Sequence, residues 1–420
     1  MIRRPESETG AAEEGRRMRK GRKRKRSGAP GILLAILGLA AAILLLFLVG
    51  RRAFPELLKA PEQTAETVAP AAEPTMAPTP EPTPEPTPEP TPEPTPEPVH
   101  YTIPEEANAG PVPLEEGYGT VSIDEPEKIL EVIRDARERG LLGEDEAVAF
   151  DPAVEFYRGV NWKDIEYYLD DTILAILWKE TIDGKCCSFA EVKIADPSQF
   201  RRKLADDTYN APRQYLGSEI AAQANAVVAM NADFYQRRDM GIVVWNRELY
   251  RMSGNRFNDE LDMYNCIETL FVDSKGNFLY KPIGEVNTEE SIREYIAEND
   301  ILFSVAFGPV LVENGEAREC TWYPLGEAFD LYSRAGIGMV DDCHYLYMSL
   351  NHGSQPARWT VNEFAKHFAE KPVRTAYCMD GGQTGQVVFR NTPYSYMDWG
   401  EERVVSDILY FVTAIPEDER

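Results

Sequence analysis

Two carboxylates in this sequence follow directly on apolar runs, a placement typical of acidic side chains at the edge of a sheet. Asp380 follows TAYCM and precedes Gly381 and Gly382, whereas Asp233 follows AVVAM and Asn231. Glycines at a strand end let a ligand approach the backbone closely, and their N–H groups can form an anion-binding nest. The alternative is turn chemistry, with Asx turns for the polar residues and a simple turn for the glycines.

Further polar side chains around these runs are suited to an anionic or sugar ligand. Gln383 and Thr384 extend the polar stretch after the glycines. His352, in NHG, can act as an acid or base near neutral pH, or can simply be a surface histidine.

The sequence does not contain the ligand spacing of a metal site. His100, His344 and His367 are far apart and form no motif with one another. We therefore predict no metal and no cofactor. A divalent cation held by Asp380, Asp233 and a backbone carbonyl is compatible with so acidic a chain, but no motif supports it.

Charge is divided very unevenly along the 420 residues. Residues 1–52 contain 13 Lys and Arg and 4 Glu, a net charge of +9. The whole chain has 44 basic and 70 acidic residues, which leaves 31 and 66 for residues 53–420, or −35. A folded part of this sign repels nucleic acid, so we predict no nucleic-acid partner.

The uncharged segment Gly31–Gly50 predicts a transmembrane helix. At about 1.5 Å per residue, its twenty residues span a hydrocarbon core of about 30 Å. The basic cluster Arg16–Arg26 precedes it, and the positive-inside rule then places the N-terminus in the cytoplasm and the rest outside. A cleaved signal peptide is the alternative, but FLVGRRAFP offers no convincing cleavage site.

A proline-rich stalk is predicted between the membrane segment and the folded part. Residues 79–98 are five TPEP repeats, which favour an extended polyproline II chain of about 60 Å. We expect the following organisation: a basic cytoplasmic tail (1–30), a membrane anchor (31–50), a stalk (51–117), a helical lead-in (118–160) and one domain (161–416).

The folded part reads as α+β, a single mixed-sheet domain with flanking helices. Helical patterns cover 125–142, 161–171, 197–207, 218–225, 288–299 and 360–371, the last with the capping box TVNE. Apolar or alternating runs rich in β-branched and aromatic residues predict strands within 172–180, 186–196, 226–235, 241–251, 266–280, 303–317, 335–350, 375–390 and 405–414. Hairpin turns are expected at DSKGN (273–277) and ENGE (313–316).

Several of these runs, in order, resemble the bacterial branch of the phosphodiester glycosidase family. They are CSFAEVKIADPSQFRRKLA, the NADFY strand end with GIVVWNRELYR, FGPVLVENGE, SRAGIGMVDDCHYLYMSLNHG, and YCMDGGQTGQVVFRN with EERVVSDILYFV. The resemblance covers about Tyr168 to Thr413. Three positions depart from the pattern, because Ala232, Arg247 and Gln383 stand where glycine is usual.

The resemblance implies hydrolysis of a sugar-1-phosphodiester at the C1–O bond, with an N-acetylglucosamine 1-phosphate type of substrate in a surface glycopolymer. Such a reaction needs a carboxylate that activates water or stabilises positive charge at C1, and donors that hold the phosphodiester. We expect Asp380 and Asp233 as catalytic carboxylates. The expected substrate-binding residues are Asn231, Arg334, His352, Gly381, Gly382, Gln383, Thr384 and Arg403. The two arginines match recurrent arginines of the family, so the resemblance implies that each can bind the phosphate with two hydrogen bonds, and a salt bridge is the alternative for each. The alternatives are a glycopolymer-binding module without catalytic activity and a purely structural envelope protein.

Overall fold

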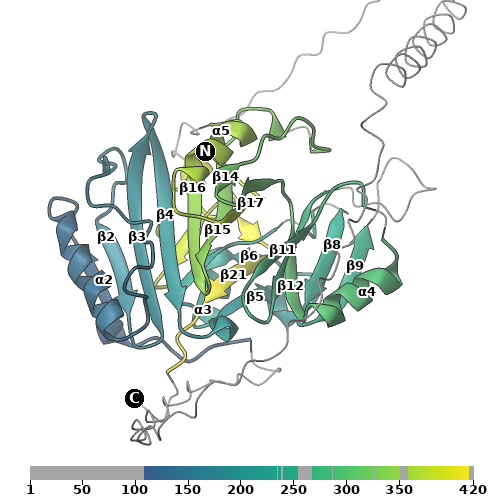
Figure 1. Cartoon of the computed structure of the whole chain (residues 1–420), viewed down its shortest axis with the longest axis horizontal. Coiled ribbons are helices and arrows are strands. Elements are labelled where there is room, and N and C mark those ends of the chain that lie inside the picture. Colours follow the sequence, from purple (N-terminus) through teal and green to yellow (C-terminus); the bar gives the residue numbers. More distant parts are fainter. Residues whose placement is uncertain are drawn as a thin grey trace, which may run out of the picture. The chain divides into compact units, whose positions relative to one another are not determined.

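The computed structural model describes residues 108–415 except 234, 238–239, 254–266, 286, 326–327 and 351–357 (Figure 1). Contacts divide the chain into two units, Met1–Glu93 and Pro94–Arg420, and every described residue belongs to the second. The predicted membrane segment, the TPEP repeats and His352 therefore lie outside the described residues. Within the described part, none of the helices has the length and apolar character needed to cross a membrane.

A nine-stranded sheet forms the centre of the described unit, and all of its pairings are antiparallel. In spatial order its strands are β1 (Tyr118–Val121), β2 (Ile165–Leu169), β3 (Ile173–Ile182), β4 (Lys185–Ile194), β16 (His344–Leu350), β15 (Arg334–Asp341), β17 (Thr375–Met379), β13 (Val310–Glu313) and β14 (Glu316–Ala317).

Three smaller sheets accompany it. The first contains β11 (Phe278–Lys281), β10 (Thr269–Asp273), β12 (Ile301–Ala306), β8 (Gly241–Trp245) and β9 (Glu248–Ser253). The second contains β19 (Thr392–Pro393), β18 (Val387–Phe389), β7 (Val228–Asn231), β21 (Asp407–Phe411) and β5 (Phe200–Leu204). A two-stranded sheet pairs β20 (Val404–Val405) with β6 (Tyr215–Leu216).

The helices cover the outer faces of these sheets. They are α2 (Ile129–Glu138), α3 (Gly217–Gln223), α4 (Glu289–Glu298) and α5 (Val361–Ala369), with 3-10 turns η2 (Glu115–Gly117), η3 (Pro126–Lys128), η4 (Pro197–Gln199), η5 (Ala205–Asp207) and η7 (Asp398–Gly400). Apolar side chains of α2 and α5 join one buried cluster with one face of the large sheet, and the opposite face packs on β7, β21, β10 and β12 in a second cluster. Figure 1 shows α4 beside β8, β9 and β12. The sheet-rich α+β architecture is thus confirmed.

Two segments predicted as helices are strands. The segment 161–171 contains β2, whose IEYYL sequence pairs with both β1 and β3 and buries Tyr168. The segment 197–207 contains β5, which pairs with β21 along its whole length. In β5 the charged side chain of Arg202 is buried because it bonds Asp407 of β21. A long-range contact therefore overrides the helical propensity of both segments.

The other local predictions agree with the structure. Thr360 caps α5, and Glu363 completes the capping box. The ENGE segment turns β13 into β14, with positive φ at Asn314 and Gly315, the geometry that a two-residue hairpin requires. Arg247, which stands where the family that the sequence resembles usually has glycine, lies in the β8–β9 turn at φ 65° and pairs with Asp300 at 2.6 Å. This departure therefore belongs to a surface turn.

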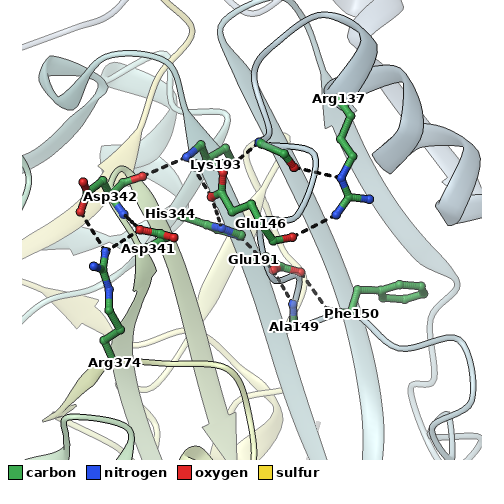
Figure 2. Close-up of polar contacts among 11 residues, drawn as sticks. Arg137, Glu146, Ala149, Phe150, Glu191, Lys193, Asp341, Asp342, His344 and Arg374 are labelled. Atoms are coloured by element: carbon green, nitrogen blue, oxygen red, sulfur yellow. Dashed lines mark hydrogen bonds and ion pairs between the residues drawn. The ribbon is translucent and has the colours of Figure 1, made fainter.

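The lead-in is fastened to the large sheet by a buried polar cluster (Figure 2). The ring of His344 on β16 contacts Glu146 at 2.8 Å through Nδ1 and Glu191 at 3.0 Å through Nε2. Glu191 accepts hydrogen bonds from the backbone N–H groups of Ala149 and Phe150. Because Glu146, Ala149 and Phe150 belong to the lead-in, the cluster holds that segment against β4 and β16. It is called the His344 cluster below.

Candidate active site

The strand register brings the ends of several sequence-predicted segments to one end of the large sheet. Arg334 at the start of β15 pairs with Leu350 at the end of β16, and Ala335 pairs with Met379 at the end of β17. Asp380 follows Met379 directly, so Asp380 and Arg334 leave the sheet at the same end. We call this end the Asp380 site.

The loop after Asp380 is shaped by its two glycines. A Cβ on Gly381 would lie 2.2 Å from the backbone oxygen of Ser333, a separation that real Cβ atoms do not show. Gly382 has φ 62° and donates its N–H to the same oxygen at 3.2 Å. The glycines thus let the loop fold tightly over the start of β15 and leave Asp380 partly exposed at its base.

Asn231 holds this loop from below rather than facing solvent. Its Nδ2 donates to the backbone oxygen of Asp380 at 2.7 Å, and its Oδ1 accepts from the hydroxyl of Tyr347 and the N–H of Gln386, both at 3.1 Å. The side chain is fully buried. Three satisfied hydrogen bonds fix the position of the Asp380 backbone.

Asp233 lies in a buried ion cluster. It pairs with Arg202 at 3.1 Å and accepts from the N–H groups of Tyr235 and Ala306 at 2.8 and 3.0 Å. Asp407 contacts the same guanidinium at 2.6 Å, and all three side chains have no exposed surface. Burial raises the pKa of Asp407 to about 7, although Arg202 opposes the shift. These contacts connect the loop after β7 to β5, β12 and β21.

Arg334 directs its guanidinium into the protein. Nε donates to the backbone oxygen of Trp359 at 3.0 Å, and Nη2 donates to those of Ala328 and Asp330 at 3.2 and 2.7 Å. Its exposure is 5%. Neutral carbonyls occupy these donors, so this arginine fixes the segment that leads into β15.

Two other guanidiniums face the Asp380 site. Arg403 donates to the hydroxyl of Thr384 at 3.4 Å, and Arg237 donates to Oε1 of Gln214 at 3.2 Å. Partial burial is the main reason that the pKa of Arg237 lies below its ordinary value; Arg403 lowers it further, and Asp380 opposes both. In the part of the chain that the structure describes, neither guanidinium forms an ion pair.

Sequence reasoning did not select Arg237. It belongs to the QRRDM segment that follows NADFY, so its closeness to a candidate carboxylate in the sequence was a usable signal. Asp380, which attracts the Arg237 guanidinium, and Arg403, which repels it, are more than 140 residues away in the chain. Only the fold brings the three charges together.

Gln383 and Thr384 complete the loop. Nε2 of Gln383 donates to the backbone oxygen of Glu401 at 3.3 Å, and the backbone of Gln383 does not have a positive φ. The left-handed position of the loop belongs to Gly382. Thr384 is buried and accepts from Arg403. The departure from glycine at position 383 therefore introduces no backbone strain.

Among the described residues, no group of three or more histidine, cysteine or acidic side chains is arranged to hold a metal ion. Among its described residues the Asp380 site offers the carboxylate of Asp380, the guanidiniums of Arg237 and Arg403, the hydroxyl of Thr384 and backbone amide groups. This donor set suits an anionic ligand such as a phosphate ester rather than a cation.

Comparison with known proteins points to one family. Residues 224–412 match the family model described as phosphodiester glycosidase. This range contains Arg237, Asp380 and Arg403. No curated protein matches the chain.

Three solved structures resemble the fold at low identity. The catalytic domain of zebrafish N-acetylglucosamine-1-phosphodiester alpha-N-acetylglucosaminidase, auto-inhibited by its pro-peptide, is 15% identical, with coverage of 65% of this chain and 92% of that chain and a TM-score of 0.44. A hypothetical protein from Synechocystis is 12% identical (59% and 63% covered, TM-score 0.42). An exported protein from Burkholderia pseudomallei is 12% identical (55% and 74% covered, TM-score 0.36).

Proposed function

We propose that this protein hydrolyses a sugar-1-phosphodiester of a surface glycopolymer, because residues 224–412 match the family model described as phosphodiester glycosidase. The substrate is of the N-acetylglucosamine 1-phosphate type, and cleavage yields a free sugar and a phosphomonoester. We place the domain outside the cytoplasmic membrane, anchored by Gly31–Gly50 and carried on the TPEP stalk. The sequence patterns of those segments support this placement.

One observation carries the proposal: a carboxylate and two guanidiniums meet at one end of the large sheet. Arg403 donates to the hydroxyl of Thr384, in the loop after Asp380, at 3.4 Å. Arg237 interacts electrostatically with both Asp380 and Arg403. Among the described residues neither guanidinium has a carboxylate ion-pair partner, and both reach solvent, so both are available to bind an anion. A phosphodiester has the charge and the oxygen geometry to accept hydrogen bonds from both. We assign phosphate binding to Arg237 and Arg403.

The chemistry then follows from the position of Asp380. As the C1–O bond breaks, positive charge develops on the sugar and the bonding electrons leave with the phosphate. Asp380 stabilises that charge or removes a proton from the attacking water, whose oxygen bonds to C1. The two guanidiniums stabilise the leaving phosphate, and the proton released from water passes to solvent.

Three buried residues position this machinery. Asn231 holds the backbone of Asp380, Arg334 holds the segment under Gly381 and Gly382, and Asp233 fixes the loop that carries Arg237. We propose these positioning roles because the side chains are 0–5% exposed and their polar atoms bond protein groups. Gln383 and Thr384 border the phosphate position, and Thr384 orients Arg403.

The decisive experiment is hydrolysis in ¹⁸O-labelled water by the full chain in detergent micelles. The substrates are methyl phosphodiesters of N-acetylglucosamine 1-phosphate, glucose 1-phosphate and mannose 1-phosphate. We expect release of a labelled free sugar and an unlabelled methyl phosphate, because the bond to C1 breaks. Label in the phosphate would show attack at phosphorus instead.

Variants separate the active site from general effects of charge. Asp380→Asn should lower kcat by about 10³-fold, the size expected when a carboxylate that acts in the transition state is lost. Asp171→Asn removes an exposed carboxylate (side chain 75% exposed) that pairs with Arg139, and should leave kcat unchanged. Binding of glycopolymer with no turnover of any substrate would reject the enzyme and support the binding module.

A further inference from the structure

The six tryptophans divide into two groups of different exposure. Trp178, Trp245 and Trp359 are buried, as the ring's large apolar area leads one to expect. In contrast, Trp162, Trp322 and Trp399 are 50%, 65% and 72% exposed. Exposed large aromatic rings mark interaction sites when they gather on one part of a surface.

These exposed rings lie at the same end of the large sheet as Asp380. Trp322 precedes Tyr323, whose hydroxyl bonds the backbone oxygen of Phe307. The next residue, Gly308, donates to the backbone oxygen of Cys378, two residues before Asp380. Trp162 lies between Asn161, which accepts from Lys179 near the end of β3, and Lys163, which donates to the Pro393 carbonyl.

Trp399 and Tyr332 flank the glycine loop of the Asp380 site most directly. Asp398 accepts a hydrogen bond from the hydroxyl of Ser333 at 2.8 Å, which joins the segment before Trp399 to the segment after Tyr332. The backbone oxygen of Ser333 in turn accepts from Gly382. Tyr332 is 45% exposed, and Phe329 and Leu331 beside it are 40% and 54% exposed.

The backbone of Trp399 is strained. Its φ is 71°, in the left-handed region that bulky residues avoid. Strain of this kind, combined with an indole held mostly in water, lowers stability and is found mainly where a residue has a function. Gly400 follows, also at positive φ, so the chain turns sharply to present this ring.

The surroundings of the rings indicate the class of ligand. Glu401 next to Trp399, Glu319 near Trp322 and Asp330 near Tyr332 are exposed and acidic. Acidic neighbours disfavour nucleic acid and anionic lipid surfaces. A neutral sugar ring has an apolar C–H face that packs on the electron-rich face of an aromatic ring, while its hydroxyls bond nearby carboxylates.

We propose that Trp399, Tyr332 and Trp322 form a rim that binds successive sugar rings of a neutral carbohydrate chain extending from the Asp380 site. This inference rests on the proposed function, because the bound carbohydrate is the glycan to which the cleaved phosphodiester belongs. The substrate class is then a sugar phosphodiester within or at the end of an oligosaccharide, and short sugar phosphodiesters are poor substrates.

Binding of oligosaccharides without phosphate tests the rim independently of hydrolysis. The full chain in detergent micelles is titrated with N-acetylglucosamine, glucose and mannose oligomers of one to six residues, followed by tryptophan fluorescence and calorimetry. At least one series should bind about tenfold more tightly as hexamer than as monomer. Trp399→Ala should weaken hexamer binding about tenfold and leave monomer binding unchanged.

Two matched variants guard against misfolding. Trp399→Gly suits the left-handed backbone, so its thermal midpoint should equal or exceed that of the parent while hexamer binding falls. Leu130→Ala removes an exposed apolar side chain (45%) from the surface of α2 and should change nothing. Leu130→Ala is also expected to hydrolyse the methyl phosphodiesters of single sugars at the parental rate.

Three results would overturn the inference. The first is an affinity that does not depend on oligomer length in any of the three series. The second is a loss of hexamer affinity in Leu130→Ala as large as that in Trp399→Ala. The third is conversion of a dimer to a monomer by Trp399→Ala in ultracentrifugation, which would make the rim a contact between copies of the protein. Turnover without dependence on length rejects the rim alone. Length-dependent binding with no turnover rejects the proposed hydrolysis and leaves the rim as a binding surface.

Discussion

Charged side chains lie at both ends of the β15–β16 strand pair. At one end they form ion pairs and hydrogen bonds with one another, and at the other end they have fewer charged partners. At one end His344 pairs with Asp341 and Lys193 along the strands, and the His344 cluster closes over it. At the other end Arg334 pairs with Leu350, and Asp380 emerges from the neighbouring strand. Eight residues of β15 separate these ends by roughly 23 Å.

The difference lies in the partners that each charge finds. In the His344 cluster, Lys193 donates to both oxygens of Glu146 at 2.9 and 3.1 Å, and Glu146 also accepts from Gly143 and His344 (Figure 2). Arg237 and Arg403, in contrast, have only neutral hydrogen-bond partners among the described residues. A network in which every charge has a partner stabilises the fold, whereas charged groups without an ion-pair partner are available to bind a ligand, as proposed for Arg237 and Arg403.

The largest effect is expected from removing both unsaturated guanidiniums. Arg237→Ala with Arg403→Ala should lower kcat/KM by about 10³-fold, or about 4 kcal/mol, because the phosphate loses two charged donors. Unfolding stability should stay within about 0.5 kcal/mol, since neither arginine is buried in an ion pair. Steady-state kinetics and urea unfolding measure the two quantities. Arg134→Ala, which removes a guanidinium 67% exposed on α2, is the control.

Disrupting the His344 cluster should have the opposite effect, with a loss of stability and no loss of activity. Glu191→Ala leaves the N–H groups of Ala149 and Phe150 and the ring of His344 without their acceptor in a buried position. We expect a loss of about 3–5 kcal/mol of unfolding free energy, with kcat/KM unchanged below the unfolding temperature.

Glu138→Ala is the matched control for this loss. It removes an acidic side chain that is 71% exposed and lies 4.0 Å from Arg134. Surface pairs of this type contribute less than about 1 kcal/mol. If Glu191→Ala lowered activity as strongly as stability, the two ends of the sheet would be coupled and the contrast between them would fail.

The His344 cluster also predicts how stability depends on pH. Burial alone would lower the pKa of His344, but its hydrogen bonds to Glu146 and Glu191 raise it above 6.5. This contribution is complete below pH 6.5 and is lost as pH rises through the raised pKa. Burial favours neutral Glu146, but His344 and Lys193 lower its pKa from 4.5 to about 2, so its contribution is complete above pH 4.5 and is lost toward pH 2.

Stability from this cluster is therefore greatest between pH 4.5 and 6.5. His344→Gln keeps one hydrogen bond but cannot be charged, so the alkaline decrease of about 1–2 kcal/mol should disappear. Urea unfolding of the parent and the variant at intervals from pH 4 to pH 9 gives the two curves. Parallel curves above pH 6.5 would show that His344 is not charged in the folded protein.

Local patterns predicted what depends on neighbouring residues. The strand TAYCM with its glycine turn, the capping box of α5 and the ENGE hairpin follow from residues within a few positions of each other. What the sequence did not predict depends on distant partners. Arg202 in a strand is understandable only with Asp407, 205 residues later. The assignment of Arg237 to the site likewise depends on its electrostatic interactions with Asp380 and Arg403.

Burial explains why the predicted site residues separate into different places. Asn231 and Asp233 were selected for the same reason as Asp380, as polar residues at ends of apolar runs, and Arg334 because it matches a recurrent arginine of the family that the sequence resembles. Where several sheets pack together, some strand ends are buried and others are exposed to solvent. The alternation of apolar and polar residues along a strand does not distinguish a buried strand end from an exposed one. The three inward residues are 0–5% exposed, whereas Asp380 is partly exposed. His352 lies outside the described residues, so its role stays a prediction.

The smallest effect concerns the residue that departs most visibly from the family pattern. Gln383→Gly should change kcat/KM by less than about threefold, because Gln383 has no positive φ and its side chain makes one hydrogen bond of 3.3 Å to the Glu401 backbone. Added backbone freedom should cost about 0.5–1 kcal/mol of stability. Gln383→Ala separates the two causes, since it removes the side chain and keeps the backbone restricted. A loss of tenfold or more in both variants would instead place the Gln383 amide on the substrate, and the unsaturated end of the sheet would then include this residue beside its two guanidiniums.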